Sequence, residues 1–347
     1  MDKPIHRTPL TQETARALNR LGIIKCGQLL QRSELSLSFA LDLSVPDVRR
    51  IIDTVAKAII PRCDSAWDIL VHKKNAPAFL PTGLYPLDET LYGGIPAGTI
   101  TELVGRAGVG KTQMCLTLTA LATLPPTNVA TSTSSVVYID TEQKFDPNRL
   151  LQIIMSRCKV RQMEQTDTAF RNLSSQELRR VCTNAVARVS VFTLTTCKEL
   201  VDRLRKLQRL VIEKNVKLLI VDSVAAVARQ EYSSIVHRQA WLNQQASLLK
   251  YIAERFEIPV VVTNQVTTRV GADASDALLP ALGNTWSHCV NTRLVLHAEN
   301  RDRCEIDQVA AVDRSLTVQK SPMADQLVLN YEISERGVTT MVKKGGQ

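Results

Sequence analysis

From residue 100 onward, short runs of β-branched and apolar residues alternate with longer segments whose apolar positions recur every three or four residues. The short runs are typical of buried strands, and the longer segments are typical of amphipathic helices. This alternation predicts an α/β domain built on a mainly parallel sheet. The predicted strands are 100–104, 136–139, 189–193, 216–221, 259–263 and 292–296.

The clearest helix follows the third predicted strand. Leucine and valine side chains share one of its faces, whereas arginines and a lysine lie largely elsewhere. We interpret the basic stripe as a solvated helix face rather than as a nucleic-acid surface. The apolar face consists of Leu200, Val201, Leu204, Leu207, Leu210 and Val211.

The first sixty residues show helical spacing and read as a small helical module. Ser44 stands at the start of a predicted helix, where its hydroxyl can cap free backbone N–H groups, and Asp47 lies three residues further on. Upstream, Gly22 marks a tight turn of the kind used in helix-hairpin-helix modules, whose backbone amides can face a phosphate. A turn between two packed helices without a ligand fits this segment equally well.

Prolines and a glycine gather between residues 61 and 86, where the helical period is lost. This composition is typical of a linker. We therefore expect three parts: a helical N-terminal domain over 1–60, a linker over 61–86 and an α/β core over 87–347.

Composition narrows the class of protein. With 44% hydrophobic and 22% charged residues, the chain of 347 residues can bury a full core, which excludes intrinsic disorder. The formal charge of +9 favours an anionic partner such as nucleic acid. Residues 1–80 hold 12 basic and 8 acidic side chains, so the excess of positive charge is shared between this region and the rest of the chain.

The cysteines and the hydropathy indicate the compartment. None of the eight cysteines pairs with another at C-x-x-C spacing, so reduced thiols in the cytosol or nucleus are the simplest interpretation. The start of the chain lacks the apolar stretch of a signal peptide, and no apolar run reaches the length of a membrane span. We expect a protein that is neither secreted nor embedded in a membrane.

One glycine-rich segment carries the strongest chemical signal. It follows the first predicted strand and satisfies G-x-x-x-x-G-K-[ST], the P-loop pattern. In this pattern backbone N–H groups surround a phosphate, the lysine reaches the β- and γ-phosphates, and the last hydroxyl ligates Mg²⁺. We expect a nucleotide and Mg²⁺ here, with Gln113 as a further nucleotide contact. The loop residues are Gly105, Arg106, Ala107, Gly108, Val109, Gly110, Lys111 and Thr112.

Three polar residues close predicted strands beyond the P-loop. Asp222 ends an apolar run and is the expected second magnesium group. Glu142 lies just past the strand over 136–139, where a base that orients and deprotonates water belongs. Gln265 follows the strand over 259–263, where it can sense the γ-phosphate. The alternatives are a loop-capping aspartate, a structural glutamate and an amide bonded to the backbone.

The order of these residues distinguishes between P-loop classes. The glutamate follows the strand after the P-loop helix, and the magnesium aspartate comes two predicted strands later. This order favours the RecA-like class over a small nucleotide kinase or a GTPase.

Several motifs resemble those of the eukaryotic and archaeal RecA-family recombinases. The resemblance covers nearly the whole chain, including a helical N-terminal module joined by a linker to an ATPase core. Within that family, residues 246–251 and 280–288 resemble the B-type paralogues more than the strand-exchange recombinase. The motifs are Thr82-Gly83, Leu87-Asp88, Gly93-Gly94-Ile95, Thr101-Glu102, Gly110-Lys111-Thr112-Gln113, Tyr138-Ile139-Asp140-Thr141-Glu142 and Thr263-Asn264-Gln265-Val266.

The resemblance implies a DNA-stimulated ATPase of homologous recombination and double-strand-break repair, with ATP and Mg²⁺ in the P-loop site. It implies work in the nucleus, in a complex with other recombinase paralogues that helps load the recombinase filament on single-stranded or branched DNA. It also implies that Arg149 lies against the adenine, where a guanidinium plane can stack. A surface arginine that starts a helix is the equally weighted alternative.

Two loops of such cores approach the DNA. The first corresponds to residues 225–238 and holds Arg229 and Arg238. The second runs over 267–288 and holds Arg269 as its basic residue. Phosphate neutralisation supplies most non-specific DNA affinity. So few basic residues therefore weaken the case for tight DNA binding by this chain alone.

Two departures from the family pattern bear on activity and assembly. Active recombinases carry glycine after the glutamate, whereas Gln143 and Lys144 follow Glu142 here. The linker also lacks the Phe-x-x-Ala patch, because Phe79 is followed at the third position by Thr82. We therefore expect a mediator that works in a hetero-oligomer. A nucleotide-stabilised scaffold with little hydrolysis and a filament-forming recombinase are the alternatives.

Overall fold

The chain divides into two compact units, Met1–Lys73 and Lys74–Gln347, and each is described by itself. The computed structural model describes residues 3–60, 63–74, 79–125, 133–164, 167–231, 234–267, 279–280, 282–300 and 312–341. The division falls within the predicted linker over 61–86.

The first unit begins with a small bundle of helices, as the sequence predicted. The Ser44 hydroxyl accepts a hydrogen bond from the Asp47 N–H and so caps the longest of them. Gly22 has a φ of +74°, a left-handed conformation that favours glycine, in the turn after the first α-helix. Ile5, Leu18, Leu29 and Val48 meet in the buried core. The helices are η1 Ile5–Arg7, α1 Gln12–Arg20, α2 Cys26–Leu30, α3 Glu34–Leu41 and α4 Val45–Ile59.

The predicted linker contains regular structure that the sequence pattern did not reveal. Helix α5 spans Ala66–Lys74, and the short strand β1 (Phe79–Leu80) pairs antiparallel with β2 (Ile95–Pro96). The apolar residues of α5 follow one another almost directly and leave Trp67 and Leu70 exposed. Without an apolar face of helical period, this helix gives no amphipathic signal.

Among the described residues, ten strands form the central sheet of the second unit in the order β12-β11-β10-β9-β3-β7-β6-β4-β5, with β8 paired to β7. From β9 to β5 neighbouring strands are parallel, and β10, β11 and β12 extend the sheet antiparallel. The predicted mainly parallel sheet is confirmed. The strands are β3 Ile100–Gly105, β4 Ser135–Asp140, β5 Val189–Thr193, β6 Val216–Asp222, β7 Val260–Thr267, β8 Leu279–Pro280, β9 Thr292–Asn300, β10 Val312–Lys320, β11 Val328–Ser334 and β12 Gly337–Thr340.

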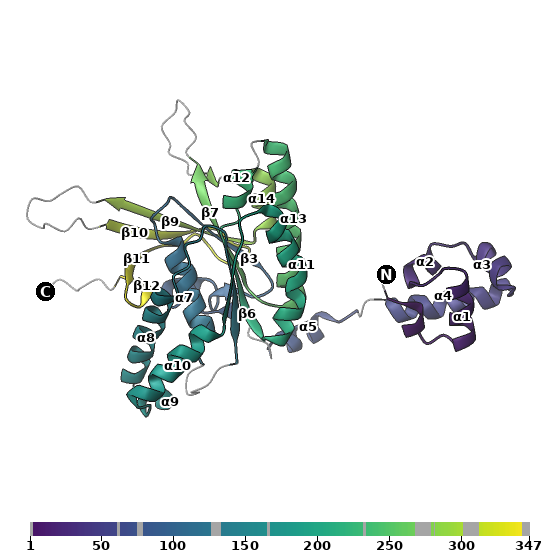
Figure 1. The fold of residues 1–347 in the computed structure, drawn as a ribbon, viewed down its shortest axis with the longest axis horizontal. Helices are drawn as coiled ribbons and strands as arrows, with labels where there is room; N and C mark the ends of the chain where they lie inside the picture. The colour runs from purple at the N-terminus through teal and green to yellow at the C-terminus, as the bar shows by residue number, and fades with distance from the viewer. Residues whose placement is uncertain are drawn as a thin grey trace, which may run out of the picture. The chain divides into compact units, whose positions relative to one another are not determined.

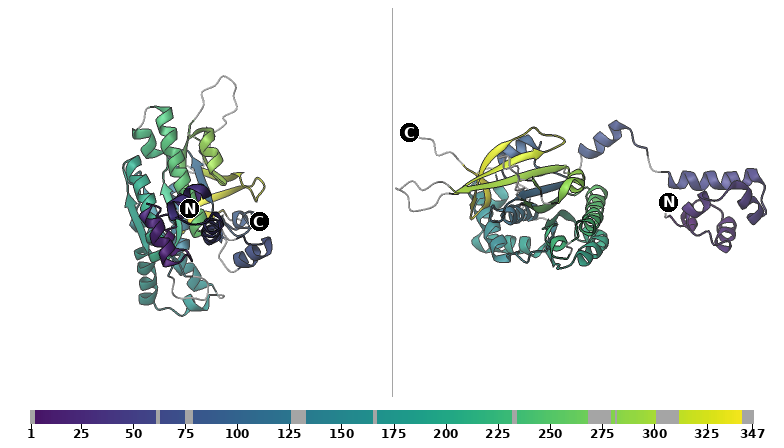
Figure 2. Two further views of the ribbon diagram at one scale, coloured as in Figure 1. Left: turned by 90° about the vertical axis from the view of Figure 1, so that its right-hand side faces the viewer. Right: turned by 90° about the horizontal axis from the view of Figure 1, so that it is seen from above.

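Helices cover both faces of this sheet (Figure 1), so its inner strands are buried on both sides. One core includes α7, α8 and α10, and the other includes α11, α13 and α14. Figure 2 shows the same arrangement from the side and from above. The helices of this unit are α6 Tyr85–Thr90, α7 Lys111–Thr123, α8 Pro147–Met163, α9 Thr168–Arg171, α10 Ser175–Ala187, α11 Cys197–Glu213, α12 Ala226–Glu231, α13 Ile235–Phe256 and α14 Gly283–Cys289.

The register of the parallel strands brings their polar ends together. Asp140 at the end of β4 lies opposite Asp222 at the end of β6, and Gly105 at the end of β3 lies opposite Gln265 on β7. Ligands of open α/β sheets bind at this carboxyl edge. The fold therefore gathers the predicted site residues of separate segments at one edge. None of the helices that the structure describes is long and apolar enough to cross a membrane.

Candidate nucleotide-binding site

The glycine-rich loop joins the end of β3 to the start of α7, as its pattern predicted. Gly110 has a φ of +112°, a conformation that L side chains rarely adopt. At Gly105 the constraint is steric, because a Cβ there would lie 2.6 Å from the Leu296 carbonyl oxygen. The turn therefore requires glycine at these positions. It leads straight into a helix N-terminus, where free N–H groups favour an anion.

The Lys111 side chain folds back over its own loop. Its Nζ donates hydrogen bonds of 2.8 Å to the carbonyl oxygens of Gly105 and Arg106. Burial lowers the pKa of Lys111, while the carboxylates of Asp222 and Glu142 offset part of that change. These hydrogen bonds hold the Lys111 ammonium group beside the loop, in a position to contact a bound phosphate.

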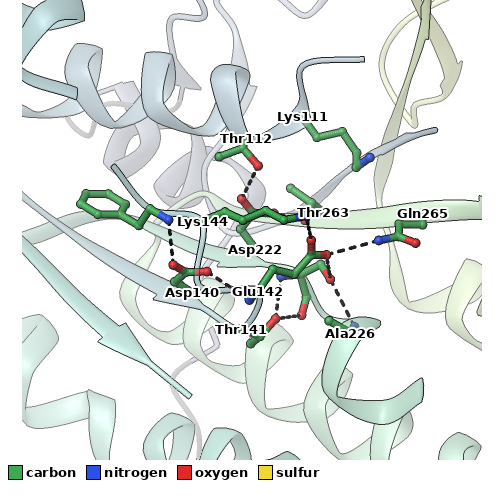
Figure 3. A network of polar contacts seen from close by, with 12 residues as sticks. Lys111, Thr112, Asp140, Thr141, Glu142, Lys144, Asp222, Ala226, Thr263 and Gln265 are labelled. Carbon is green, nitrogen blue, oxygen red and sulfur yellow. Dashed lines mark hydrogen bonds and ion pairs between the residues drawn. The ribbon is translucent and has the colours of Figure 1, made fainter. Parts of the chain in front are cut away.

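Asp222 is the centre of a buried hydrogen-bond network at the end of β6 (Figure 3). Its Oδ2 accepts hydrogen bonds of 2.8 Å from the Thr112 hydroxyl and from the Tyr138 hydroxyl. Its Oδ1 accepts one from the Thr263 hydroxyl. A hydroxyl beside a carboxylate is the oxygen set that Mg²⁺ prefers in such sites. The predicted pair Thr112 and Asp222 therefore fits that ion.

Glu142 points toward the same centre from just past the end of β4 (Figure 3). Its Oε1 accepts hydrogen bonds from the Ser223 hydroxyl at 2.9 Å and from Gln265 Nε2 at 3.4 Å. Its Oε2 pairs with Lys144 Nζ. Burial alone would raise the pKa of Glu142, but hydrogen bonds from Lys144 and Ser223 hold it below the usual glutamate value. The carboxylate is therefore ionised at neutral pH, as a base must be.

Asp140 shapes the turn that carries Glu142. Its Oδ1 accepts a hydrogen bond of 3.1 Å from the Glu142 N–H, and its Oδ2 accepts one of 2.8 Å from the Phe145 N–H. The Phe145 ring packs edge-on against Tyr138, with ring centroids 4.8 Å apart. These contacts fix the backbone on both sides of the glutamate.

Arg149 lies in the first turn of α8 and is held through several nitrogen atoms. Nε donates to the Gln113 side-chain oxygen at 2.9 Å, and the terminal nitrogens donate to Gln152 and to the Ser334 carbonyl oxygen at 2.6 Å each. Gln113 itself lines the cavity. The guanidinium is thus fixed at the edge of the site, and its predicted contact with adenine stays a prediction.

The C-terminal hairpin of β11 and β12 reaches the P-loop. The Tyr331 hydroxyl donates a hydrogen bond of 2.6 Å to the Val109 carbonyl oxygen. Burial raises the pKa of Tyr331 to about 12, so its hydroxyl remains a donor at neutral pH. Ile333 packs so closely that a Cβ at Gly110 would lie 2.7 Å from its Cδ1. The hairpin therefore supports the loop from one side.

A cavity of about 240 Å³ lies between the P-loop and the side chains of Glu142, Asp222 and Gln265. It brings together predicted residues from four segments that lie far apart in the sequence, and it is open to solvent on one side. Its lining residues are Ala107, Gly108, Gly110, Lys111, Thr112, Gln113, Glu142, Lys144, Asp222, Gln265 and Ile333.

The predicted DNA-binding residues lie differently. Arg229, on α12, donates a hydrogen bond of 3.0 Å to the Gln265 side-chain oxygen. Burial lowers the pKa of Arg229, and nearby Arg238 lowers it further. Arg269 lies outside the residues that the structure describes. A chain of hydrogen bonds thus runs from Glu142 through Gln265 to Arg229, from the candidate site to the first predicted loop.

Several side chains that contribute to the site were not among the predicted site residues. Ser223 and Thr263 lie at the ends of predicted strands. At these strand ends we had chosen only the neighbouring acidic and amide side chains as site residues. Tyr138 lies within a strand, where it resembles an ordinary core residue. Tyr331 lies 222 residues from its partner Val109, and no local pattern could reveal that contact.

A P-loop after a central strand, with carboxylates beyond neighbouring parallel strands, is the arrangement of a RecA-like P-loop ATPase. The comparison with known families agrees and is more specific. The Rad51 family model matches residues 73–341. The chain therefore belongs to the Rad51 family, whose members act in recombination and DNA repair.

Individual relatives refine this assignment. The chain is 36% identical to "DNA repair protein RAD51 homolog 2" of Mus musculus, over 97% of each chain. The protein of the same name from Arabidopsis thaliana is 30% identical, over 93% of this chain and 86% of the plant protein. The crystal structure of the RadB recombinase matches with a TM-score of 0.55 and 25% identity, covering 76% of this chain and all of RadB. The predicted recombinase-paralogue family and RecA-like fold are confirmed.

Proposed function

We propose that this protein is an ATP-binding, DNA-dependent ATPase that serves homologous recombination and double-strand-break repair as a recombinase mediator. The observation that carries the proposal is the hydrogen bond of 2.8 Å between the Thr112 hydroxyl and Asp222 Oδ2. These residues lie 110 positions apart, and they meet beside Lys111 in one cavity. A phosphate-and-magnesium site accounts for such convergence more simply than a structural turn does.

Each residue has a role in this proposal. The loop N–H groups and Lys111 bind the β- and γ-phosphates, and Arg149 lies against the adenine. Thr112 and Asp222 would hold Mg²⁺, which neutralises charge on the phosphates when it is bound. Glu142 orients a water whose oxygen bonds to the γ-phosphorus while the bond to the bridging oxygen of ADP breaks. The water proton passes to Glu142, and Gln265 senses whether the γ-phosphate is present.

We further propose that the chain works in the nucleus in a complex with other recombinase paralogues. The missing Phe-x-x-Ala patch supports unlike subunits over a homopolymer. The complex would act on the recombinase filament and on single-stranded or branched DNA, with Arg229, Arg238 and Arg269 as contacts. The bond between Arg229 and Gln265 supports a link between DNA and nucleotide, because it joins the two regions directly.

The test is nucleotide binding by the full-length chain and by the complex purified with it from native extract. Lys111→Ala removes the ammonium group and is expected to lower ATP affinity at least tenfold, about the value of one hydrogen bond to a charged group. Lys250→Ala is the matched control, because Lys250 pairs with Glu254 on an exposed helix face. Unchanged ATP binding by Lys111→Ala would refute the nucleotide site. Recovery of the chain only as a monomer would refute the complex.

A second candidate is a scaffold that binds nucleotide for structural reasons and hydrolyses little. The observation that favours it is the ion pair between Lys144 and Glu142, which occupies an oxygen of the proposed base. Glu142→Gln distinguishes the two functions. A loss of turnover in the assembled complex supports the ATPase, whereas undiminished repair activity without turnover supports the scaffold.

A further inference from the structure

Lys144 places a second ammonium group in the nucleotide cavity. It belongs to the segment between β4 and α8, and it lines the same cavity as Lys111. Its side chain is 61% exposed, whereas that of its partner Glu142 is 16% exposed. The carboxylate is therefore fixed within the site, while the lysine reaches it from the open side on a long stem with many accessible rotamers.

The ion pair occupies the carboxylate oxygen that is otherwise free. Glu142 Oε1 already accepts hydrogen bonds from Ser223 and Gln265. Lys144 takes Oε2. A water that Glu142 is to deprotonate must bond to one of these oxygens, and Oε2 has fewer protein donors. The lysine and the water thus compete for one atom.

The charges around Lys144 come from several elements. Asp140 on β4 and Asp222 on β6 add to the attraction of Glu142, and Lys111 on α7 lies near enough to be repelled. A terminal phosphate bound at Lys111 would bring new negative charge to the same cavity. Partly exposed ion pairs exchange partners readily because each is worth little in water. The lysine therefore has two competing anionic partners when ATP is present.

We propose that Lys144 makes the site selective for the terminal phosphate: its ammonium group pairs with Glu142 in the absence of a γ-phosphate and moves to that phosphate when ATP binds. The move releases Glu142 Oε2 for water. This inference rests on the proposed ATP-binding function of the same cavity. ADP has no γ-phosphate, so the lysine stays on Glu142 when ADP is bound. Lys144 is thus a specificity residue that distinguishes ATP from ADP.

The first test compares the affinity of the full-length chain for ADP and for a non-hydrolysable ATP analogue, both with Mg²⁺. Lys144→Met keeps the length of the side chain and removes its charge. Its affinity for the analogue is expected to fall about tenfold, the value of one hydrogen bond to a charged group. Its affinity for ADP should change less than about twofold. Lys144→Arg should keep the preference, and the matched control Lys250→Met should behave as wild type.

The second test is a double-mutant cycle on analogue binding. Glu142→Gln removes the competing carboxylate, so in the wild-type background it should tighten binding of the analogue several-fold by freeing Lys144. The same change in Lys144→Met should have a clearly smaller effect, because no ammonium group is left to transfer. Equal effects in both backgrounds would show that the two residues act independently and would overturn the proposal.

The outcomes separate this proposal from the proposed function. If Lys144→Met binds both nucleotides as wild type does while Lys111→Ala loses them, the ATP site stands and the role of Lys144 falls. If the wild-type chain and its complex bind neither nucleotide, the proposed function fails and this inference fails with it. Thermal unfolding of each variant shows whether the fold is retained.

Discussion

The Arg293 guanidinium donates a hydrogen bond of 2.6 Å through Nε to the carboxylate of Glu102, with both side chains buried. The other oxygen of Glu102 accepts from Asn264 at 2.8 Å and from Trp286 at 2.7 Å. One carboxylate thus joins β3, β7, β9 and α14. Because β3 leads into the P-loop and Asn264 precedes Gln265, this buried cluster ties together the strands that carry the candidate site.

Removing the charge of Glu102 should therefore destabilise the core. Glu102→Gln keeps the shape but leaves the Arg293 charge buried without a counter-charge, which is expected to cost about 3 kcal/mol of unfolding free energy. Urea unfolding followed by circular dichroism measures it. Glu34→Gln serves as the control, because its partner Arg49 lies on an exposed surface. Equal unfolding curves for the two variants would contradict the prediction.

Thr112 should control the dependence of nucleotide binding on magnesium. Thr112→Ala removes the hydroxyl beside Asp222, so affinity for ATP with Mg²⁺ is expected to fall about tenfold, as for loss of one bond to a charged group. With the metal chelated, the variant and the wild type should bind ATP alike. Thr119→Ala is the matched control on α7, since the Thr119 hydroxyl donates a hydrogen bond to the Cys115 carbonyl oxygen of the same helix. A loss that persists without metal would contradict this role.

Tyr331→Phe tests the support that the C-terminal hairpin gives the P-loop. Loss of the hydroxyl leaves the Val109 carbonyl without this donor and is expected to cost about 1 kcal/mol of unfolding free energy. Affinity for ATP should fall several-fold, because the loop loses a fixed point. Isothermal titration measures the affinity, with Tyr85→Phe as the exposed control. Unaltered binding would show that the loop holds its shape without the hairpin.

Arg229 should connect DNA to ATP turnover. Arg229→Gln removes a charge next to Gln265, so the complex is expected to lose several-fold in DNA-stimulated turnover. If the arginine also contacts a phosphate, the salt dependence of DNA affinity should weaken by about one unit of slope. Arg209→Gln, on the exposed face of α11, is the control. If DNA stimulates ATP turnover equally in Arg229→Gln and in the wild type, Arg229 does not connect DNA binding to turnover.

The sequence predicted the strands of the parallel part of the sheet because each is a run rich in β-branched and apolar residues, and all of them except the edge strand β5 are largely buried on both faces. It did not predict β10, β11 and β12 at the antiparallel end of the sheet. In these strands apolar residues are interspersed with polar ones. Antiparallel strands with one face less buried carry a weaker hydrophobic signal than a strand that is buried on both faces. Helix α5 was missed for a related reason, since its exposed apolar residues follow no helical period.

Site residues divide in the same way. Lys111 and Thr112 were predictable because their chemistry depends on a local spacing, and Asp222 because it ends an apolar strand. Ser223 acts on Glu142 only through the register of β4 against β6. The pairing of Lys144 with Glu142 needs the turn that Asp140 forms. A pattern of residue types along the chain cannot predict contacts that depend on strand register or turn geometry.

The hydrogen bond between Tyr331 and Val109 has a consequence for how the protein is made. The P-loop emerges from the ribosome early, but the tyrosine that holds its carbonyl follows 222 residues later. A nascent chain that lacks β11 therefore carries the P-loop without this support. Until β11 is made, the shape of the loop depends on the strand before it and the helix after it.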